Sequence, residues 1–369
     1  MTKGKQVKIY LSGHRIALVA VLCFFALCVQ SVVTQKKHKP KGKDEKIYLI
    51  HSDELKFDHY GMNPDAQIAK GRVHFRHQGA ELWCDSAYFY QESNSVKAFG
   101  NVRFRQGDTL SLTSRYADYD GVEQRMAARY NVVLTHRKQV LRTDSLNYDR
   151  LYNYAYFLEG GVLEDGKDKL VSDWGKYNLE TREAVFYYNV RMRSDDTDIA
   201  TDTLYYDTRK SQAHIVGPGS TIHTKDGVVL TTDAYYDTKT DKAQLFNRSR
   251  LEDTEKVLEG DSLFYAKDGD SYGYGRVVYI DKKNKNSLVC DKLKYNEKTG
   301  EGYATKRALL KDFSQSADTL YAHSDSIRIY TFNINTDSVY RKIHCYNHVS
   351  VYRTDVQAIS DSIVFNSQD

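Results

Sequence analysis

A short phrase that recurs at a fixed spacing constrains this chain more than any other feature of its sequence. "TDTLYYD" (residues 201–207) has close counterparts in "RTDSLNYD", "TTDAYYD" and "GDSLFYA". We call the position of Asp202 the slot. Slots fall at Asp53, Asp85, Arg115, Asp144, Asp173, Asp202, Thr232, Asp261 and Asp291, at intervals of 32, 30, 29, 29, 29, 30, 29 and 30 residues. A fixed period of this kind is typical of a repeat architecture.

The residues around the slot are more regular than the slot itself. The third residue before it is always apolar, as in Leu141, and the fourth residue after it is always aromatic, as in Tyr148. Between these positions apolar residues alternate by twos, which is typical of half-buried strands. A second strand follows about ten residues later, often introduced by a Gly-Asn or Tyr-Asn pair, as in "AFGNVRFR" and "RYNVVLTH". Each repeat is therefore predicted to hold two strands and two turns.

The phase of the pattern predicts an irregularity at the slot. The apolar and aromatic positions are seven residues apart, and in an unbroken strand they face opposite sides of a sheet. If both belong to the core, the ladder slips by one residue near the slot, as at a β-bulge or strand corner. An Asp between Ser or Thr residues suits that place, because its carboxylate accepts hydrogen bonds from nearby backbone N–H groups. The Gly-Asn and Tyr-Asn pairs are predicted to be bends or bulges with positive φ.

The period weakens after Asp291. Asp318, Asp337 and Asp361 resemble slots at shorter and uneven spacing, and "IRIYTFNI" is an alternating strand between them. We expect the natural chain to continue past residue 369, or a partner to complete the last strand pairing. If each repeat gives one strand to each of two sheets, nine repeats span roughly 40–45 Å.

The N-terminus is typical of an exported protein. Four basic residues precede a 14-residue apolar run, Ile16 to Val29, which is short for a membrane span and suits a signal peptide. A cleaved signal with a cut after Ser31 and an uncleaved anchor extended through Val33 both remain open. Much of the net charge of +4 lies in the first 46 residues, so a nucleic-acid partner is not expected.

The residue types do not point to catalysis. An active site needs one asymmetric constellation, whereas a recurring Asp slot indicates a common structural role. His344, Cys345 and His348 lie close in sequence, but neighbouring strand residues face opposite sides, which disfavours a metal site. Outside the signal, Cys84, Cys290 and Cys345 are too widely spaced for a disulfide framework. We predict a protein that is not an enzyme and that has no cofactor and no metal.

The iterated phrase resembles the OstA-like family of lipopolysaccharide-transport proteins, in particular those of Bacteroidetes-type Gram-negative bacteria. The matching segments are "CDSAYFY … VKAFGNVRF", "TDSLNYD … AYFLEGGVL" and "TDTLYYD", and the resemblance extends from Ile47 to about Tyr303. It implies an all-β, elongated antiparallel β-jellyroll, a V-shaped sandwich of two facing sheets. It also implies a periplasmic protein that shields the lipid A acyl chains of lipopolysaccharide and contributes to outer-membrane assembly.

The implied partners are lipopolysaccharide, other jellyroll proteins of the transport bridge joined by edge-strand pairing, and a second copy of the chain. No motif defines ligand contacts, so the lipid-binding candidates are the inward-facing positions Phe57, Val73, Phe75, Phe89, Val102, Phe104, Tyr119, Val132, Leu134, Leu146, Tyr148, Val190, Met192, Leu204 and Tyr206. A charge placed at Leu146 or Val102 is expected to abolish lipid binding while the fold persists.

Two other functions remain open on the sequence. The first is a structural or adhesive repeat protein with a closed core and no lipid ligand, and the second is a polysaccharide-active enzyme. The predicted organisation is a signal peptide or anchor (residues 1–34), a basic linker (35–46), jellyroll repeats (47–205) and further repeats (206–369) that become less regular after 300 and are incomplete at the C-terminus.

Overall fold

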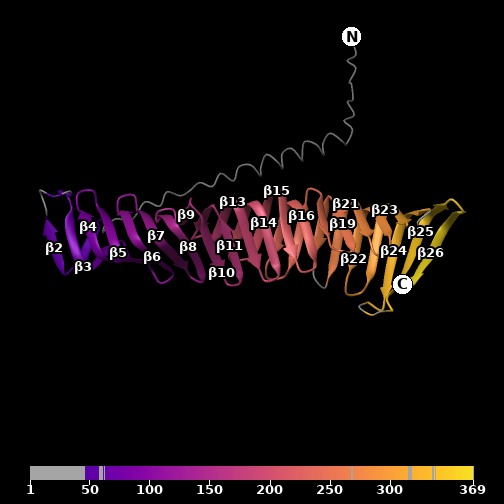
Figure 1. The fold of residues 1–369 in the computed structure, drawn as a ribbon, viewed down its shortest axis with the longest axis horizontal. Helices are drawn as coiled ribbons and strands as arrows, with labels where there is room; N and C mark the ends of the chain where they lie inside the picture. Colours follow the sequence, from indigo (N-terminus) through magenta and orange to yellow (C-terminus); the bar gives the residue numbers. More distant parts are fainter. Residues whose placement is uncertain are drawn as a thin grey trace, which may run out of the picture. The chain divides into compact units, whose positions relative to one another are not determined.

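The described part of the protein is built from β-strands. The computed structural model describes residues 46–57, 61, 63–266, 269–314, 318–334, 336 and 338–368. The predicted signal and most of the basic linker lie outside these residues. The strands, which follow one another in chain order (Figure 1), are β1 (Tyr48–His51), β2 (Glu54–Phe57), β3 (Gln67–His77), β4 (Ala80–Tyr90), β5 (Ser95–Gln106), β6 (Leu110–Asp120), β7 (Arg125–His136), β8 (Gln139–Asp149), β9 (Tyr154–Phe157), β10 (Gly161–Asp165), β11 (Asp168–Ser172), β12 (Trp174–Asn178), β13 (Glu183–Ser194), β14 (Thr197–Asp207), β15 (Gln212–Thr224), β16 (Gly227–Asp237), β17 (Lys242–Phe246), β18 (Ser249–Glu252), β19 (Lys256–Gly260), β20 (Ser262–Tyr265), β21 (Asp270–Asp281), β22 (Asn286–Asn296), β23 (Glu301–Asp312), β24 (Leu320–Phe332), β25 (Tyr340–Arg353) and β26 (Val356–Gln368).

All strand pairings among these residues are antiparallel, and each position in the ladder pairs with the next one along the chain. Some positions hold two short strands end to end, such as β9 with β10 and β11 with β12. The predicted fold class, an all-β antiparallel structure with two strands per 29–30-residue repeat, is confirmed. The part of the chain that the structure describes contains no helix long and apolar enough to cross a membrane.

Each long strand changes register once, at the slot or opposite it. In the β4–β5 pair the register shifts between Trp83 and Ser86, which brackets Asp85. In the β13–β14 and β14–β15 pairs the shifts bracket Asp202 in the same way. Because of this shift, residues three before and four after the slot, such as Leu82 and Phe89, are both buried. The predicted bulge is therefore confirmed.

The bulge divides the sandwich into two layers. The first layer holds the strand segments that follow a slot and their ladder partners, such as Ser86–Tyr90 with Ser95–Phe99. The second layer holds the segments that precede a slot and their partners, such as Ala80–Trp83 with Arg103–Gln106. Hairpin turns lie at the ends of the strands away from the bulges. We call the side where the turns of the two layers approach each other the mouth.

A pair of residues with positive φ lies opposite each slot Asp on the neighbouring strand. Gly100 and Asn101 have φ of 71° and 43°, and the Asn101 side-chain amide donates to the Asp85 carboxylate at 2.8 Å. The backbone N–H of Asn131 donates to Asp144 at 2.8 Å. The predicted positive φ of these pairs is confirmed. The slot carboxylate, however, accepts from a neighbouring strand, and often from a side chain instead of backbone N–H groups.

In several repeats the second residue of the positive-φ pair is Arg and not Asn. Arg72, Arg276 and Arg307 lie beside Asp53, Asp261 and Asp291, with N–O distances of 2.6, 2.7 and 2.7 Å. Each arginine lowers the pKa of its slot carboxyl through a hydrogen bond. The Asn and Arg side chains therefore perform the same task, which is to bind the carboxylate at the corner.

The late slots differ from the prediction. The register shifts of β24 and β26 bracket Asp325 and Asp361, at longer intervals than in the earlier repeats. Asp361 is confirmed as a slot. Asp318 is not one, because it precedes β24 and accepts from the backbone N–H of Thr354 at a hairpin turn. Asp337 lies outside the described residues. The spacing of the repeats did not predict these slots correctly, because the connections before β24 and β25 are longer than the hairpin turns of the regular repeats.

The predicted span was also wrong. Both strands of a repeat cross the bulge, so each repeat gives two strands to each layer instead of one. At about 4.8 Å per strand, the ladder advances by roughly 9.6 Å per repeat, about twice the expected value.

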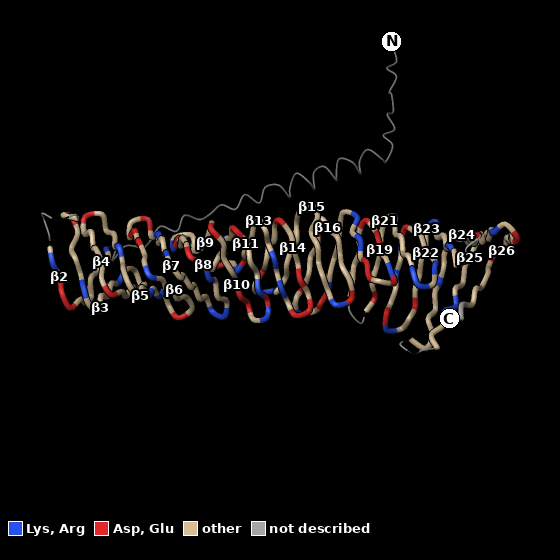
Figure 2. The backbone as a smooth tube through the Cα atoms, viewed as in Figure 1, with Lys and Arg blue, Asp and Glu red and all other residues tan. Residues whose placement is uncertain are grey.

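The core lies between the two layers. One cluster of buried apolar residues runs from Ile47 to Leu263, and a second runs from Val277 to Val351. The first cluster is continuous across residues 205 and 206, and the division of the repeats at that point stays a prediction. Lys and Arg alternate with Asp and Glu along the whole ladder, and neither sign gathers in one segment (Figure 2).

Candidate functional site

The interior between the layers is the candidate site, because it contains nearly all of the predicted lipid-binding residues. Val73, Phe75, Phe89, Val102, Phe104, Tyr119, Val132, Leu134, Leu146, Tyr148, Val190, Met192, Leu204 and Tyr206 are all buried, with at most 3% of each exposed. Phe57 is the exception at 56% exposed. It lies on β2 and pairs with Gln67, at the first position of the ladder among the described residues.

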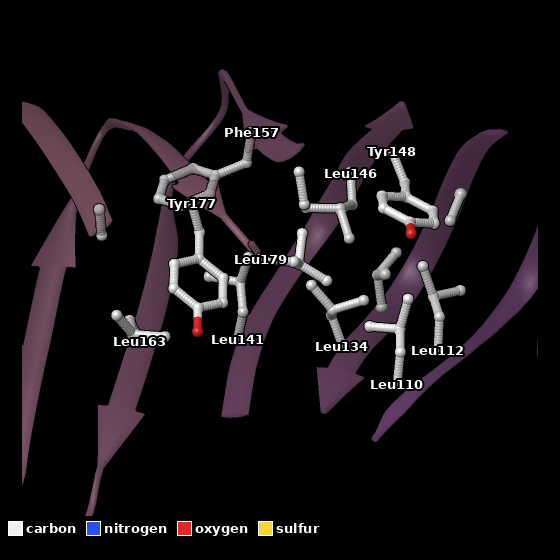
Figure 3. Close-up of a cluster of buried hydrophobic side chains, with 14 of the residues drawn as sticks. Leu110, Leu112, Leu134, Leu141, Leu146, Tyr148, Phe157, Leu163, Tyr177 and Leu179 are labelled. Carbon is white, nitrogen blue, oxygen red and sulfur yellow. The ribbon is translucent and has the colours of Figure 1, made fainter. Parts of the chain in front are cut away.

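Side chains from the two layers meet directly in this interior. The ring of Phe104, from the second layer, lies 6.1 Å from that of Tyr148, from the first. Phe75 and Phe89 pair in the same way, with centroids 5.3 Å apart. Figure 3 shows Leu134 and Leu141 of the second layer pointing toward Leu146 of the first. The space is filled by protein atoms over this part of the ladder.

Burial at Leu146 and Val102 changes the expected effect of a charge there. Leu146 is 0% exposed and Val102 is 1% exposed. A carboxylate at either position has neither water nor a partner, and this cost is large relative to the stability of a domain. This burial revises the expectation from the sequence: we now predict that the fold does not persist with a charge at either position.

A row of hydrogen bonds closes the mouth. The aromatic residue four after the slot is usually Tyr, and its hydroxyl reaches a polar side chain at a strand end of the second layer. Tyr119 bonds to His77 Nδ1 at 2.7 Å, Tyr148 to Gln106 at 3.0 Å and Tyr177 to His136 Nδ1 at 3.0 Å. Tyr206 donates to Asp168 at 2.6 Å, and Tyr236 bonds to Thr197 at 3.2 Å. We call these five contacts the seam.

Two buried carboxylates make the seam strongest at Tyr206. Asp165 and Asp168 are 4% and 3% exposed and lie on either side of the β10–β11 turn. Asp168 also accepts from Ser194 at 2.6 Å and from Thr238 at 2.9 Å. Burial, followed by the hydrogen bond to Asp168, raises the pKa of Tyr206, so the phenol stays protonated and donates. Hydrogen bonds to a charged acceptor are about twice as strong as neutral ones.

Arginine joins neighbouring seam contacts. Arg150 donates from Nε to Gln106 at 3.0 Å and from Nη1 to the Tyr119 hydroxyl at 2.6 Å. Its Nη2 donates to the backbone carbonyl of Gln78 at 3.2 Å. Because Arg150 follows β8 in the first layer and Gln78 lies in a turn of the second, this side chain also bridges the mouth.

The cavities found among the described residues are not an acyl-chain site. A cavity of about 10 Å³ lies at the N-terminal end of the interior, lined by Ile47, Phe75 and Tyr119 among others. It is about the size that holds one water molecule. A larger hollow of about 520 Å³ is lined by turn residues near Asp226 and Asp253 and lies outside the apolar interior.

The interior is less completely buried toward its C-terminal end. Leu293, Ile329, Ile343, Ile363 and Phe365 face inward by their register, yet each is only partly buried. Ile329 and Phe365 lie four residues after the slots Asp325 and Asp361. Because they have no hydroxyl group, they cannot form a seam hydrogen bond. Near this end, Arg341 and Asp281 form an ion pair across the two layers, with an N–O distance of 3.8 Å. These five partly buried residues form what we call the open end.

The histidine and cysteine candidates lie in separate environments. His344 is hydrogen-bonded to Ser362, and His348 is hydrogen-bonded to Asp325. Cys345, which follows His344 in sequence, is buried. His74 stacks on Trp83 on the outer face of the second layer, whereas His77 belongs to the seam. Cys84 and Cys290 are buried free thiols, and burial raises the pKa of Cys84 to about 12 and that of Cys290 to about 11.

Sequence reasoning missed the seam, although a signal was present. His77, Gln106, His136 and Asp165 each end a strand of the second layer and recur at the repeat period. Each lies 41 or 42 residues before the tyrosine to which it is hydrogen-bonded. Polar residues are common at turns, so this recurrence alone does not distinguish solvent exposure from buried contacts across the sandwich.

This chain is similar to a known protein family and to solved structures. Residues 44–202 match the model of a family described as OstA-like protein. The structure of LptH from Pseudomonas aeruginosa, described as the LptA-homologous periplasmic component of the lipopolysaccharide transport device, is similar at 13% identity and a TM-score of 0.19. The match covers 38% of this chain and 82% of that one, and a TM-score this low does not establish a common fold. The search of curated proteins gives no match.

Proposed function

Because residues 44–202 match the model of the OstA-like protein family, we propose that the chain is an exported lipopolysaccharide-transport or bridge protein. In this proposal, lipid A acyl chains lie in the apolar interior between the two layers, and the protein contributes to outer-membrane assembly. It acts in the periplasm, to which the N-terminal segment directs it. Binding is driven by removal of acyl chains from water, at about 0.8 kcal/mol per buried methylene group.

The open end carries the proposal. Ile329, Ile343 and Ile363 face inward and remain partly exposed, as a surface that receives a lipid must. Apolar side chains that stay partly exposed beside a buried core are candidates for a ligand-binding surface. The acyl chains are proposed to enter here, because no seam bond has to break first at Ile329 or Phe365.

The closed part of the interior would have to open before lipid could pass along it. Each seam contact is a hydrogen bond that water can replace, so separating the layers costs less there than breaking the continuous ladder at the bulges. The bulge side is proposed to stay intact while the mouth widens. The seam then sets how readily the N-terminal repeats admit an acyl chain.

The edges of the ladder are the proposed sites for other jellyroll proteins or a second copy of the chain. β1 and β2 occupy one end and β26 the other, and each pairs on one side with a strand of this chain. A strand edge presents unpaired N–H and C=O groups that can extend the sheet into a partner.

A second function is favoured by one observation, the filled core from Ile47 to Leu263. A structural or adhesive protein with a closed core and no lipid ligand has such an interior throughout. The two proposals differ in what the open end does, so an experiment on that end separates them.

Native mass spectrometry of the full chain after incubation with lipopolysaccharide tests the proposal. The transport function predicts a mass shift of one or more lipid molecules, which Ile343→Asp abolishes because a carboxylate then faces the acyl chains. Lys342→Asp is the matched control, since its side chain faces outward from the same strand, and it should bind as the unaltered protein does. Absence of any lipid adduct on the folded, unaltered protein would support the closed-core alternative instead.

A further inference from the structure

The outer face of the first layer carries an aromatic belt that neither the core nor the seam uses. The belt consists of Tyr205, His214, Tyr235, Phe246, Phe264 and Tyr274, one ring from each of six successive ladder positions. The centroid distances along it are 5.7, 4.0, 6.3, 5.9 and 5.9 Å. The rings therefore form an unbroken row across β14, β15, β16, β17, β20 and β21.

Stacking of cross-strand rings stabilises a sheet, but it does not account for how much of the belt is in contact with solvent. Tyr205 is 44% exposed and Tyr274 is 37% exposed. The other four rings are partly exposed. Large rings held in a row at a water-accessible surface indicate an interaction site, because each ring offers apolar area at a small cost in conformational entropy.

The width of the belt limits what can bind to it. Polar residues border it on the same face, among them Gln244 and Ser262, which lie opposite Tyr235 and Tyr274 in the register. A globular protein or a bilayer needs a broad apolar patch of several hundred Å². A row one or two rings wide fits an extended ligand with flat apolar faces and polar edges, and a chain of sugar rings has this shape.

The charges near the belt favour a negatively charged chain. Asp233 and Asp270 are carboxylates on this face, and each already has a partner: His214 Nε2 lies 2.9 Å from Asp233, and Lys294 Nζ lies 2.8 Å from Asp270. Lys292 lies over the ring of Tyr274 at 5.7 Å, at the C-terminal end of the belt. Its ammonium group can meet a carboxylate or phosphate group of a ligand there.

We propose that the aromatic belt binds a linear, negatively charged glycan, whose sugar rings stack on the aromatic side chains while Lys292 contacts its acidic groups. This site lies on the outer face of the first layer, on the opposite side of the sheet from the apolar interior. It does not rest on the proposed lipid binding, and a glycan without any lipid tests it separately.

Affinity electrophoresis through gels that contain polygalacturonate measures this binding in the full chain. The unaltered protein should be retarded, and Tyr205→Ala/Tyr235→Ala should weaken the apparent affinity by at least about tenfold. The control Tyr321→Ala/Tyr352→Ala removes a cross-strand pair of exposed tyrosines from the outer face of the second layer and should change nothing. Equal retardation of both double variants, or no retardation of the unaltered protein, would overturn the proposal.

A fluorescence measurement tests the same binding in a variant whose belt is intact, so that misfolding caused by a substitution in the belt cannot explain the result. Trp83 and Trp174 are the tryptophans of the chain. Trp174 packs against Tyr187 with the rings tilted and their centroids 4.9 Å apart, on the same outer face as the belt. In Trp83→Phe, the emission of Trp174 should shift on addition of polygalacturonate, whereas neutral dextran should have a weaker effect. A shift with phosphatidylglycerol vesicles and none with polygalacturonate would assign the belt to a membrane surface and contradict the proposal.

Discussion

The hydroxyl of Tyr206 and the carboxylate of Asp168 form a 2.6 Å hydrogen bond that joins the two layers of the sandwich across its mouth. Tyr206 belongs to the phrase "TDTLYYD" and lies four residues after the slot Asp202. Its ring is part of the apolar interior, and its hydroxyl belongs to the polar seam. One residue of the repeated phrase thus contributes both to the core and to the closure of that core.

Removal of this hydroxyl should destabilise the sandwich. Tyr206→Phe leaves Asp168 with its bonds from Ser194 and Thr238 but deletes a charge-assisted one, at a cost of about 1.5–3 kcal/mol. Urea denaturation followed by circular dichroism measures the change. Tyr205→Phe is the matched control, since Tyr205 is 44% exposed on the outer face, and it should shift stability by less than about 0.5 kcal/mol. Equal effects of the two variants would contradict the role given to the seam.

Acid should weaken the seam at His136. Burial, followed by the nearby charges of Arg137 and Arg182, lowers the pKa of His136 below its ordinary value of 6.5. The unfolded chain therefore binds a proton at a higher pH than the folded chain does. The stability due to neutral His136 is full above about pH 6.5 and is lost as pH falls from there toward the lowered pKa.

This pH effect can be measured by thermal unfolding between pH 7.5 and 5. The melting temperature of the unaltered protein should fall more steeply than that of His136→Gln, whose amide can still bond to Tyr177 but does not titrate. His74, whose pKa burial also lowers, should keep part of the slope in both proteins. Identical slopes would exclude His136 as a contributor to the acid sensitivity.

The bulge should tolerate little change at Gly100. Its φ of 71° favours glycine, and a Cβ there would lie 2.4 Å from a carboxylate oxygen of Asp85. Gly100→Ala should cost more than the roughly 1–2 kcal/mol of a left-handed residue alone. In an Asp85→Ala background the clash is gone, so the same substitution should cost less. Strictly additive free energies of unfolding in this double-mutant cycle would argue against the close approach.

The closed and open parts of the interior should respond differently to charge. Leu146→Asp places a carboxylate at a position that is 0% exposed, and we expect it to abolish cooperative unfolding. Ile343→Asp introduces the same group at the partly buried open end and should leave a folded protein. Far-ultraviolet circular dichroism and a thermal melt distinguish the two outcomes. A fully folded Leu146→Asp variant would mean that the layers already separate in solution.

The sequence predicted the strands and the corner at Asp202 because period and phase are local properties of the chain. The positive φ of Asn101 and Asn189 followed in the same way from residue type. The pairing of Tyr206 with Asp168 could not be derived, since it joins the ends of two strands, the residues being 38 apart in sequence, and their approach depends on how far the layers fold over each other. For the same reason the pattern marked Leu146 as inward-facing but could not show whether the interior is filled there, and only the three-dimensional structure separates the filled part of the interior from its open end.

Site-specific photo-crosslinking tests most directly the claim that the interior of the sandwich receives lipid acyl chains. A photoreactive amino acid at Ile329 or Ile343, which face the open end, should form adducts with lipopolysaccharide in living cells. The same group at Arg328, which lies over the outer rings of Tyr303 and Tyr346, should form none. Adducts at both inward positions and not at Arg328 are the predicted result, whereas no adduct at either inward position would contradict the account.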